Sequence, residues 1–226
     1  MSKTEETVAE RKFDAVMFDL DGTLLDTLED LADSMNEVLA ARGHPVHPID
    51  AYRYFVGDGM NNLIRRALPN EAADEGNVEN AAVEMRAIYA KRWNAKSKPY
   101  DGIPEMLTAL SRSSLRLCVL SNKPDGFTRL CVDTLLDPAH FEIVRGAVAG
   151  VPKKPEPVAA IRIAAEMGVP RDRFLYLGDT NTDMKTANGA GMFAVGAAWG
   201  FRPESELVQY GAQVVIHHPR EMLDLV

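Results

Sequence analysis

The chain alternates between short apolar runs and longer segments in which apolar residues recur with helical spacing. Residues 15–18 are apolar and are followed at once by polar and acidic residues, which predicts a buried strand that ends there. From Thr27 to Leu39 apolar side chains recur every three or four positions, and Gly43 then ends the pattern. The N-terminal part therefore predicts a strand, a short connection and an amphipathic helix.

Between Asp26 and Lys98 the patterns are helical, and no convincing strand interrupts them. Further helices are predicted at residues 60–68 and 81–93, separated by a polar stretch. We therefore expect a small all-helical domain inserted into a larger one. The expected boundaries are 25–97 for the helical cap domain, and 1–24 with 98–226 for a discontinuous core domain.

After Gly102 short apolar runs alternate with helical patterns. The predicted strands are 115–120, 143–144, 174–177, 193–195 and 214–216, and the predicted helices are 104–110, 125–136, 155–167 and 184–190. Such alternation is typical of a parallel sheet with helices on both faces. The predicted fold is therefore α/β, with a Rossmann-like parallel sheet that also includes the N-terminal strand.

Composition narrows the class of protein. The chain has 226 residues, of which 46% are hydrophobic and 26% charged, so it is long enough for one large or two small globular domains. A formal net charge of -8 argues against nucleic acid as a partner, since binding to a phosphate backbone relies on clustered Lys and Arg. Cys118 and Cys131 indicate neither a disulfide framework nor a zinc site, which fits a reducing cytoplasm.

The N-terminus gives no indication of targeting. Met1 to Lys12 is polar and acidic, without the apolar segment of a signal peptide, and no stretch of the chain approaches the length of a membrane span. We expect a cytoplasmic protein with no membrane partner and a frayed N-terminal leader.

Two acids follow the first predicted strand. Asp19 and Asp21 occupy alternate positions, so they point to the same side of the chain, and Gly22 comes next. Two like charges that share a site are unfavourable unless a shared proton or a cation relieves them, and a divalent metal would do so. The alternative is an acidic loop that opens a helix, with Asp or Thr as N-cap before Leu24.

Polar side chains also follow other predicted strands. They are Ser121-Asn122-Lys123 after one strand, Gly178-Asp179-Thr180 with Asp183 after another, and Lys153-Lys154 before Pro155 at a predicted helix start. In open parallel sheets, ligands bind at the carboxyl ends of the strands. Acids, a hydroxyl, a lysine and a helix N-terminus at that edge predict a metal-assisted phosphate site.

Each of these residues also has a purely structural explanation. Ser121 could end a strand, and Lys154 could belong to a solvated lysine pair. Asp179 could be a helix N-cap, with Asp183 an acid in the first turn. Their occurrence together, each at a predicted strand end or helix start, favours the site.

Taken in order, the four motifs resemble those of the haloacid-dehalogenase-like superfamily of aspartyl-phosphate phosphotransferases, from about Phe13 to the C-terminus. The helical insert is similar to the small helical cap domain of that superfamily. Four tracts are most similar to phosphoglycolate phosphatases: Leu24 to Thr27, Val56 to Gly59, Ser121 to Pro124, and Lys154 to Pro157.

The resemblance and the chemistry together imply catalytic and metal-binding roles. Asp19 would attack phosphorus and form an acyl phosphate, while Asp21 would act as the general acid and base. Mg²⁺ would be held by the Asp19 carboxylate, the backbone carbonyl of Asp21 and Asp179, with Asp183 as a ligand directly or through water.

Other residues would bind the substrate. Ser121 and Lys154 would hold the phosphoryl oxygens, with Asn122, Thr23 and backbone NH groups near Gly22 as further donors. The expected specificity residues lie in the cap: Gly57-Asp58-Gly59 with Arg53, Arg65 or Arg66. The negative charge of Asp58 argues against a carboxylated substrate.

The expected function is a Mg²⁺-dependent phosphatase acting on a small phosphorylated metabolite, with 2-phosphoglycolate as the first candidate. The expected partner is a small phosphate ester, and the protein is expected to be a monomer or homodimer. A pyrophosphatase or a sugar-phosphate mutase would use the same core, whereas a dehalogenase of this superfamily would lack the second acid, Asp21. A catalytically idle interaction module is the alternative of another class, but such a module is expected to have lost a motif residue.

Overall fold

The computed structural model describes residues 12–226, so the expected leader lies almost wholly outside the described residues. Within this range six parallel strands form one sheet in the order β5-β4-β1-β6-β7-β8. Their bounds are β1 Ala15–Phe18, β4 Arg116–Pro124, β5 Ile143–Ala147, β6 Phe174–Gly178, β7 Phe193–Ala197 and β8 Val214–Ile216. The α/β fold predicted from the sequence is confirmed.

The strand order reverses between β1 and β6. The chain builds the sheet outward from β1 through β4 to β5, and then returns to place β6, β7 and β8 on the other side of β1. Phe18 at the end of β1 is level with Val119 of β4 and Leu177 of β6. In doubly wound sheets a ligand crevice opens at such a reversal, outside the carboxyl ends of the strands.

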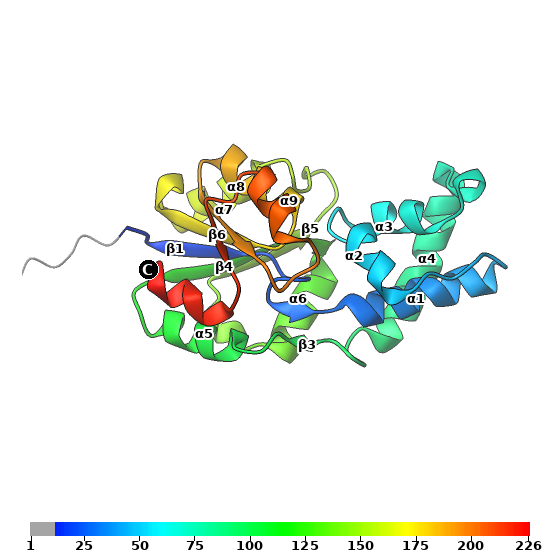
Figure 1. The fold of residues 1–226 in the computed structure, drawn as a ribbon, viewed down its shortest axis with the longest axis horizontal. Helices are drawn as coiled ribbons and strands as arrows, with labels where there is room; N and C mark the ends of the chain where they lie inside the picture. The colour runs from blue at the N-terminus through cyan, green and yellow to red at the C-terminus, as the bar shows by residue number, and fades with distance from the viewer. Residues whose placement is uncertain (1–11) are drawn as a thin grey trace, which may run out of the picture.

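Helices cover both faces of the sheet (Figure 1). Helices α5 Ile103–Ser111 and α6 Asp125–Leu135 lie on one face, and α7 Val158–Met167, α8 Asn181–Ala190 and α9 Glu204–Gln209 on the other. Successive β1 residues belong to different core clusters, Val16 and Phe18 to one and Ala15 and Met17 to the other. Because both faces of β1 are buried, the strand is a continuous apolar run.

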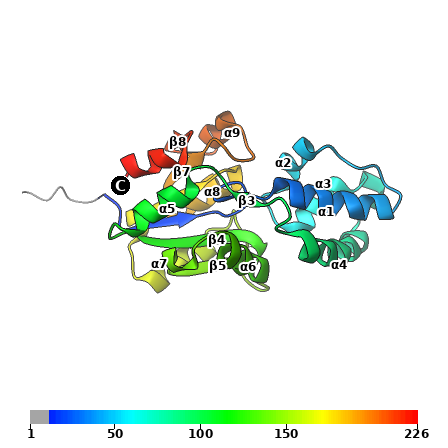
Figure 2. The ribbon, with the colours of Figure 1, turned by 90° about the horizontal axis from the view of Figure 1, so that it is seen from below.

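A second group of helices lies beyond the carboxyl ends of the sheet strands (Figures 1 and 2). These cap helices are α1 Leu28–Ala41, α2 Tyr52–Phe55, α3 Met60–Ala67 and α4 Glu75–Arg92, with the 3-10 turns η1 Ile49–Ala51 and η2 Asn70–Ala72. α1 packs against α4 through its buried apolar side, which includes Met35 and Leu39. The cap is therefore positioned over the edge where the predicted site residues were expected.

Two short strands join the cap to the core. β2 Leu25–Asp26 pairs antiparallel with β3 Lys98–Pro99. Beside them, Oδ2 of the buried Asp30 accepts hydrogen bonds from the backbone NH of Lys96 at 3.0 Å and of Ser97 at 2.8 Å. These strands were not predicted, because two residues are too few to show a periodicity. They hold the two crossings of the chain side by side.

Several element boundaries differ from the prediction. α4 begins at Glu75 rather than 81, because the Asp74 side chain caps it by accepting a hydrogen bond from Asn77. β4 continues to Pro124 rather than ending at 120, and α7 begins at Val158 rather than 155. Besides β2 and β3, the elements that were not predicted are α2, α9, the 3-10 turns already named, η3 Pro138–His140, η4 Arg171–Arg173 and η5 Pro219–Asp224.

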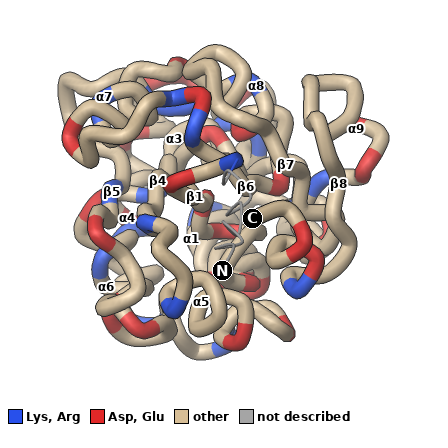
Figure 3. The backbone as a smooth tube through the Cα atoms, turned by 90° about the vertical axis from the view of Figure 1, so that its left-hand side faces the viewer, with Lys and Arg blue, Asp and Glu red and all other residues tan. Residues whose placement is uncertain are grey.

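Basic and acidic positions are interspersed along the chain, as Figure 3 shows. Across residues 12–226, no helix combines the length and the apolar character needed to cross a membrane. Cys118 and Cys131 are both buried free thiols.

Candidate active site

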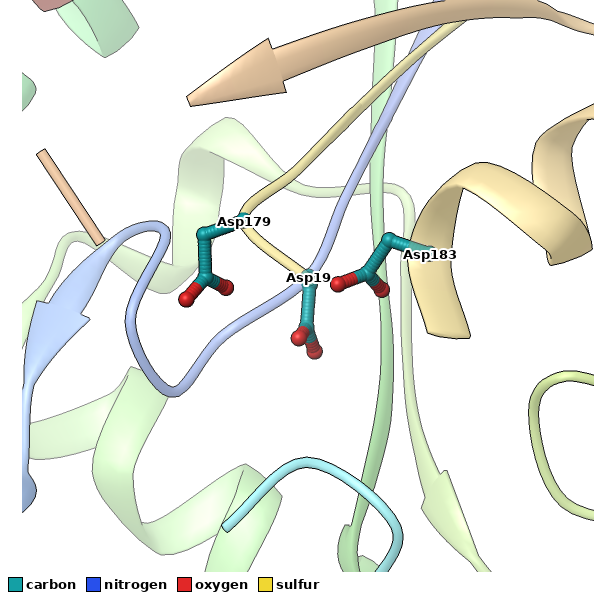
Figure 4. Close-up of side chains that lie close together, drawn as sticks. All are labelled: Asp19, Asp179 and Asp183. Atoms are coloured by element: carbon teal, nitrogen blue, oxygen red, sulfur yellow. The ribbon is translucent and has the colours of Figure 1, made fainter. Parts of the chain in front are cut away.

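Three buried carboxylates converge at the carboxyl ends of β1 and β6 (Figure 4). Asp19 directly follows β1, Asp179 directly follows β6, and Asp183 lies in the first turn of α8. Each offers an oxygen, and these oxygens lie within 4.8 Å of one another. The structure thus brings together three acids that were predicted from two separate motifs.

Asp179 is held by neighbours on both oxygens. Its Oδ1 accepts a hydrogen bond from Thr23 Oγ1 at 2.9 Å, and its Oδ2 accepts one from the backbone NH of Phe201 at 2.8 Å. Gly22 has a φ of +87°, and a Cβ at that position would collide with the Asp179 carboxylate. The hydroxyl proton of Thr23 is thus directed at Asp179, a predicted metal ligand. Direct binding of phosphate by Thr23 stays a prediction.

Asp183 belongs to the acidic cluster and also takes part in capping the N-terminus of α8. Its Oδ2 accepts hydrogen bonds from Thr180 N at 3.1 Å and Thr180 Oγ1 at 2.7 Å, and its own backbone NH donates to Thr180 Oγ1 at 3.4 Å. The reciprocal bonds between the two residues form a capping box at the start of α8. The N-cap is therefore Thr180 and not Asp179. The structural explanation of Asp183 as a first-turn acid is correct, but its Oδ1 faces the cluster and lies 2.7 Å from Lys154 Nζ.

Lys154 lies between two of the carboxylates. Its buried Nζ is 2.8 Å from Asp19 Oδ1 and 2.7 Å from Asp183 Oδ1. Burial opposes the charge, but the two carboxylates raise the pKa of Lys154 well above its ordinary value. The residue precedes a cis peptide bond to Pro155, and α7 begins three residues further on.

Asn122 fixes the backbone of Lys154. Its Oδ1 accepts from Lys154 N at 2.9 Å, and its Nδ2 donates to Lys154 O at 2.9 Å and to Gly57 O of the cap at 3.0 Å. Ser121, buried beside it, accepts a hydrogen bond from the backbone NH of Lys123 at 3.2 Å. A hydroxyl can accept and donate at once, so Ser121 retains a proton for a phosphoryl oxygen.

The acidic cluster carries more negative charge than its protein neighbours balance. Burial, together with the charge of Asp183, raises the pKa of Asp19 to about 7 from 3.8, although Lys154 acts in the opposite direction. Burial and the neighbouring acids also raise the pKa of Asp179 well above its ordinary value. Lys154 is close to Asp19 Oδ1 but lacks hydrogen-bond geometry, so this buried oxygen has no hydrogen-bond donor among residues 12–226.

These observations fit a hard divalent cation. Mg²⁺ prefers oxygen ligands and is commonly held by one or two carboxylates with waters and substrate phosphate. Asp19, Asp179 and Asp183 supply carboxylate oxygens, one of which lacks a donor. A cation would also relieve the repulsion that raises the pKa values of Asp19 and Asp179.

Asp21 has different surroundings. Its Oδ1 accepts from Thr27 Oγ1 at 2.7 Å, and Lys123 Nζ lies 2.9 Å from Oδ1 and 3.3 Å from Oδ2. Lys123 also donates to the hydroxyl of Tyr89, on cap helix α4, at 2.8 Å. The carboxylate of Asp21 therefore stands outside the acidic cluster, and metal binding through its backbone carbonyl stays a prediction.

A pocket between cap and core opens onto these groups. The core contributes Asp19, Asp21 and the end of β4 from Ser121 to Pro124. The cap contributes mainly apolar residues: Leu31, Val56, Met60, Leu63, Met85 and Tyr89. Of the described residues that line this pocket, Lys123 is the one with a positive charge.

The charged cap residues predicted to set specificity are engaged elsewhere. Asp58 pairs with Arg66 and accepts a hydrogen bond from Thr182 Oγ1 at 2.6 Å, and these contacts lower its pKa although burial opposes the shift. Arg53 donates to Gly200 O at 2.9 Å, and Arg65 pairs with Glu75. Of the predicted cap residues, Gly57 and Gly59 line the pocket, whereas Asp58 and the three arginines do not. The argument from Asp58 against a carboxylated substrate was therefore wrong, because Arg66 compensates that charge outside the pocket.

Sequence reasoning assigned no role to Lys123, Thr27 or Tyr89. Lys123 stands two positions after Ser121 on β4, so the same alternation that paired Asp19 with Asp21 would have placed it beside Ser121. Tyr89 carries no such signal, because its approach to Lys123 depends on how the cap packs on the core.

Comparisons with known proteins find relatives that are named as phosphatases. The chain is 30% identical to a phosphoglycolate phosphatase of Pseudomonas savastanoi pv. phaseolicola over 226 residues, which cover 99% of this chain and 83% of that protein. It is 31% identical to an N-acetylmuramic acid 6-phosphate phosphatase of Pseudomonas aeruginosa, with 94% of each protein covered.

Solved structures extend the agreement to three dimensions. A crystal structure from Lactobacillus delbrueckii subsp. bulgaricus, provisionally described as a phosphoglycolate phosphatase, superimposes with a TM-score of 0.88 at 27% identity and covers 95% of this chain and 99% of that one. A haloacid dehalogenase-like family protein from Streptococcus pneumoniae has the same fold, with a TM-score of 0.86 at 21% identity, covering 94% of this chain and 98% of that one. The sequence profile of the haloacid dehalogenase-like hydrolases matches residues 16–197, and the chain belongs to that family.

Proposed function

We propose that this phosphoric monoester hydrolase is a Mg²⁺-dependent phosphatase that acts on a small phosphorylated metabolite through an aspartyl-phosphate intermediate. The observation that carries the proposal is the position of Asp19. Its buried carboxylate lies in a cluster suited to a divalent cation, beside Lys154, and lines a pocket that also contains Asp21 and Ser121.

Each residue has a defined part in the proposed reaction. A carboxylate oxygen of Asp19 forms a bond to phosphorus while the bond between phosphorus and the ester oxygen breaks. The electron pair of the broken bond stays on the ester oxygen, which leaves with the alcohol. The proton of Asp21 passes to the departing oxygen, and Asp21 later takes a proton from the water that hydrolyses the acyl phosphate. Ser121 and Lys154 hold the phosphoryl oxygens by hydrogen bond and charge.

Asp19, Asp179 and Asp183 would hold the Mg²⁺ ion. When bound, the ion supplies positive charge that stabilises the developing charge on the phosphoryl oxygens. Thr23 and the backbone NH of Phe201 orient Asp179 in this arrangement, and Thr180 orients Asp183.

The relatives name two substrates to test. The first candidate is 2-phosphoglycolate, the substrate named for the relative from Pseudomonas savastanoi. The second is N-acetylmuramic acid 6-phosphate, named for a relative that this chain matches over 94% of both lengths. We further propose that residues 25–97 act as a cap domain on a core of 1–24 and 98–226, and that the protein works in the cytoplasm as a monomer or homodimer.

The first test is hydrolysis of 4-nitrophenyl phosphate with Mg²⁺ and with an excess of chelator. Activity that is lost with chelator and restored by Mg²⁺ is expected. A screen of phosphorylated metabolites by kcat/KM then ranks the substrates, since that ratio reports differential binding of transition states. Metal-independent hydrolysis, or no hydrolysis of any phosphate ester, would overturn the proposal.

A further inference from the structure

Lys123 is a buried cation that the proposed reaction does not use. Its side chain is 3% exposed, and its ammonium group has three protons. Three oxygens lie within reach: Oδ1 of Asp21 at 2.9 Å, Oδ2 of Asp21 at 3.3 Å and the hydroxyl of Tyr89 at 2.8 Å. The hydrogen-bonding capacity of Lys123 is thus matched by Asp21 and one cap residue.

These contacts come from separate parts of the chain. Lys123 lies near the end of core strand β4, whereas Tyr89 lies on cap helix α4. The Tyr89 ring packs edge-on against Phe127 of core helix α6, with ring centroids 5.1 Å apart, and the ammonium of Lys123 lies 4.8 Å from the Tyr89 centroid. Tyr89 can meet Lys123 only while α4 lies against the core.

Thr27 supplies the third contact of this arrangement. It is the residue before α1, and it caps no helix NH with its side chain; instead its hydroxyl donates to Asp21 Oδ1 at 2.7 Å. The carboxylate of Asp21 is therefore fixed from the residue that precedes α1 and from the end of β4. The contacts with Thr27 and Lys123 together determine the position of the Asp21 carboxylate and the plane of its two oxygens.

We propose that Lys123 is a positioning residue for Asp21, and that Tyr89 completes this arrangement when the cap closes, so that proton transfer to the leaving group depends on cap closure. The inference rests on the proposed function. It assigns a purpose to a buried lysine whose ammonium group donates to Asp21 and Tyr89 and to none of Asp19, Asp179, Asp183, Ser121 and Lys154.

The test separates proton transfer from the rest of the reaction. A 4-nitrophenolate leaving group departs without a proton, whereas an alkoxide needs one, and kcat/KM covers the steps up to the first irreversible one. Lys123→Met and Tyr89→Phe are therefore assayed with 4-nitrophenyl phosphate and with a simple alkyl phosphate. Tyr89→Phe keeps the ring that packs on Phe127 and removes the oxygen that Lys123 contacts.

For Lys123→Met we expect kcat/KM on the alkyl phosphate to fall roughly ten- to a hundredfold more than on the aryl phosphate. This selective loss is a part of the roughly 10²–10⁴-fold rate enhancement that general acid–base catalysis supplies. Tyr89→Phe should show the same selective loss to a smaller extent, and the double variant should lose less than the product of the two single losses. Lys185→Met is the matched control, because that exposed lysine also lies over a tyrosine ring, Tyr210 at 4.4 Å, outside the pocket.

Equal losses on both substrates would overturn the inference, because a general structural defect does not discriminate between leaving groups. If Lys123→Met does not fold, Tyr89→Phe decides, and an unchanged ratio of the two kcat/KM values in that variant contradicts the proposal. A wild-type protein that hydrolyses neither ester refutes the proposed function instead, so the two failures are distinguishable.

Discussion

Replacing the proposed nucleophile by its amide should stabilise the metal-free protein while abolishing its activity. Asp19→Asn keeps the shape of the side chain and removes one negative charge from the cluster formed with Asp179 and Asp183. The usual expectation for a buried polar residue is a loss of stability on substitution. Here the sign should be reversed, because burial and Asp183 make ionisation of Asp19 unfavourable in the folded state.

The magnitude follows from the pKa of Asp19. A rise from 3.8 to about 7 is a difference of about 3 units, and at roughly 1.4 kcal/mol per unit it corresponds to about 4 kcal/mol in the free energy of unfolding. Because the folded-state pKa is the higher one, this stability is fully present below about pH 4 and is lost as the pH rises through about 7. Asparagine does not titrate, so the variant should escape the loss.

The assay is thermal unfolding in excess chelator at pH 5 and pH 8. A protein of this size changes its Tm by about 2–4 °C per kcal/mol, so at pH 8 the variant should melt up to about 8–16 °C above wild type. At pH 5 the difference should be less than half as large, since the folded carboxyl is then still protonated and only the unfolded-state carboxyl, with its pKa of 3.8, has ionised. Asp172→Asn, an exposed substitution, is the control for a lost surface charge. A variant no more stable than wild type at pH 8, or an equal difference at both pH values, would refute this reasoning.

Three further substitutions test the metal site and the cap. Asp179→Asn should remove most of the Mg²⁺-induced rise in Tm. For wild type at a hundredfold excess of Mg²⁺ over Kd, binding adds about 2.7 kcal/mol to the free energy of unfolding, which raises the Tm by about 5–11 °C. Equal shifts in the two proteins would place the metal elsewhere. Gly22→Ala should destabilise the protein by more than the roughly 1–3 kcal/mol of an unfavourable backbone conformation, as measured by urea unfolding, because its Cβ collides with the Asp179 carboxylate. Gly43→Ala, with a φ of +71° and open space around it, measures the backbone cost alone, and equal losses would contradict the collision. Asp58→Asn should weaken the contact of the cap with Thr182. Amide hydrogen exchange in residues 56–60 should therefore become faster, while the affinity for Mg²⁺ stays unchanged. Unaltered exchange would show that this contact does not restrain the cap.

The sheet could be predicted because its strands are buried on both faces. Residues 15–18 and 174–177 form continuous apolar runs that end at acids, and such runs stand out against the helical spacing around them. The acidic cluster followed from the same feature, since parallel strands place their carboxyl ends at one edge. What periodicity could not show was the start of α4, where the cap residue Asp74 and polar helix positions hide the pattern.

The surroundings of Asp21 could not be predicted in full, because they depend on contacts between cap and core. Nothing in the sequence near Tyr89 indicates that its hydroxyl meets Lys123, since 34 positions separate the two residues and a hydrogen bond leaves no local pattern. The role expected for Asp58 failed for the same reason. Its partner Thr182 lies 124 positions away, on the core, and only the packed structure shows that Asp58 turns away from the pocket.

The central claim is that Asp19 carries the phosphoryl group, and trapping that group tests it most directly. Asp21→Asn removes the residue that activates the hydrolytic water, so the acyl phosphate should accumulate when the variant is mixed with Mg²⁺ and 4-nitrophenyl phosphate and then quenched in acid. Proteolysis and mass spectrometry should find the phosphoryl group on the carboxylate of Asp19, and Asp19→Asn treated in the same way should carry none. A phosphoryl group on another residue, or an Asp19→Asn protein that still turns over at more than about a hundredth of the wild-type rate, would contradict the account.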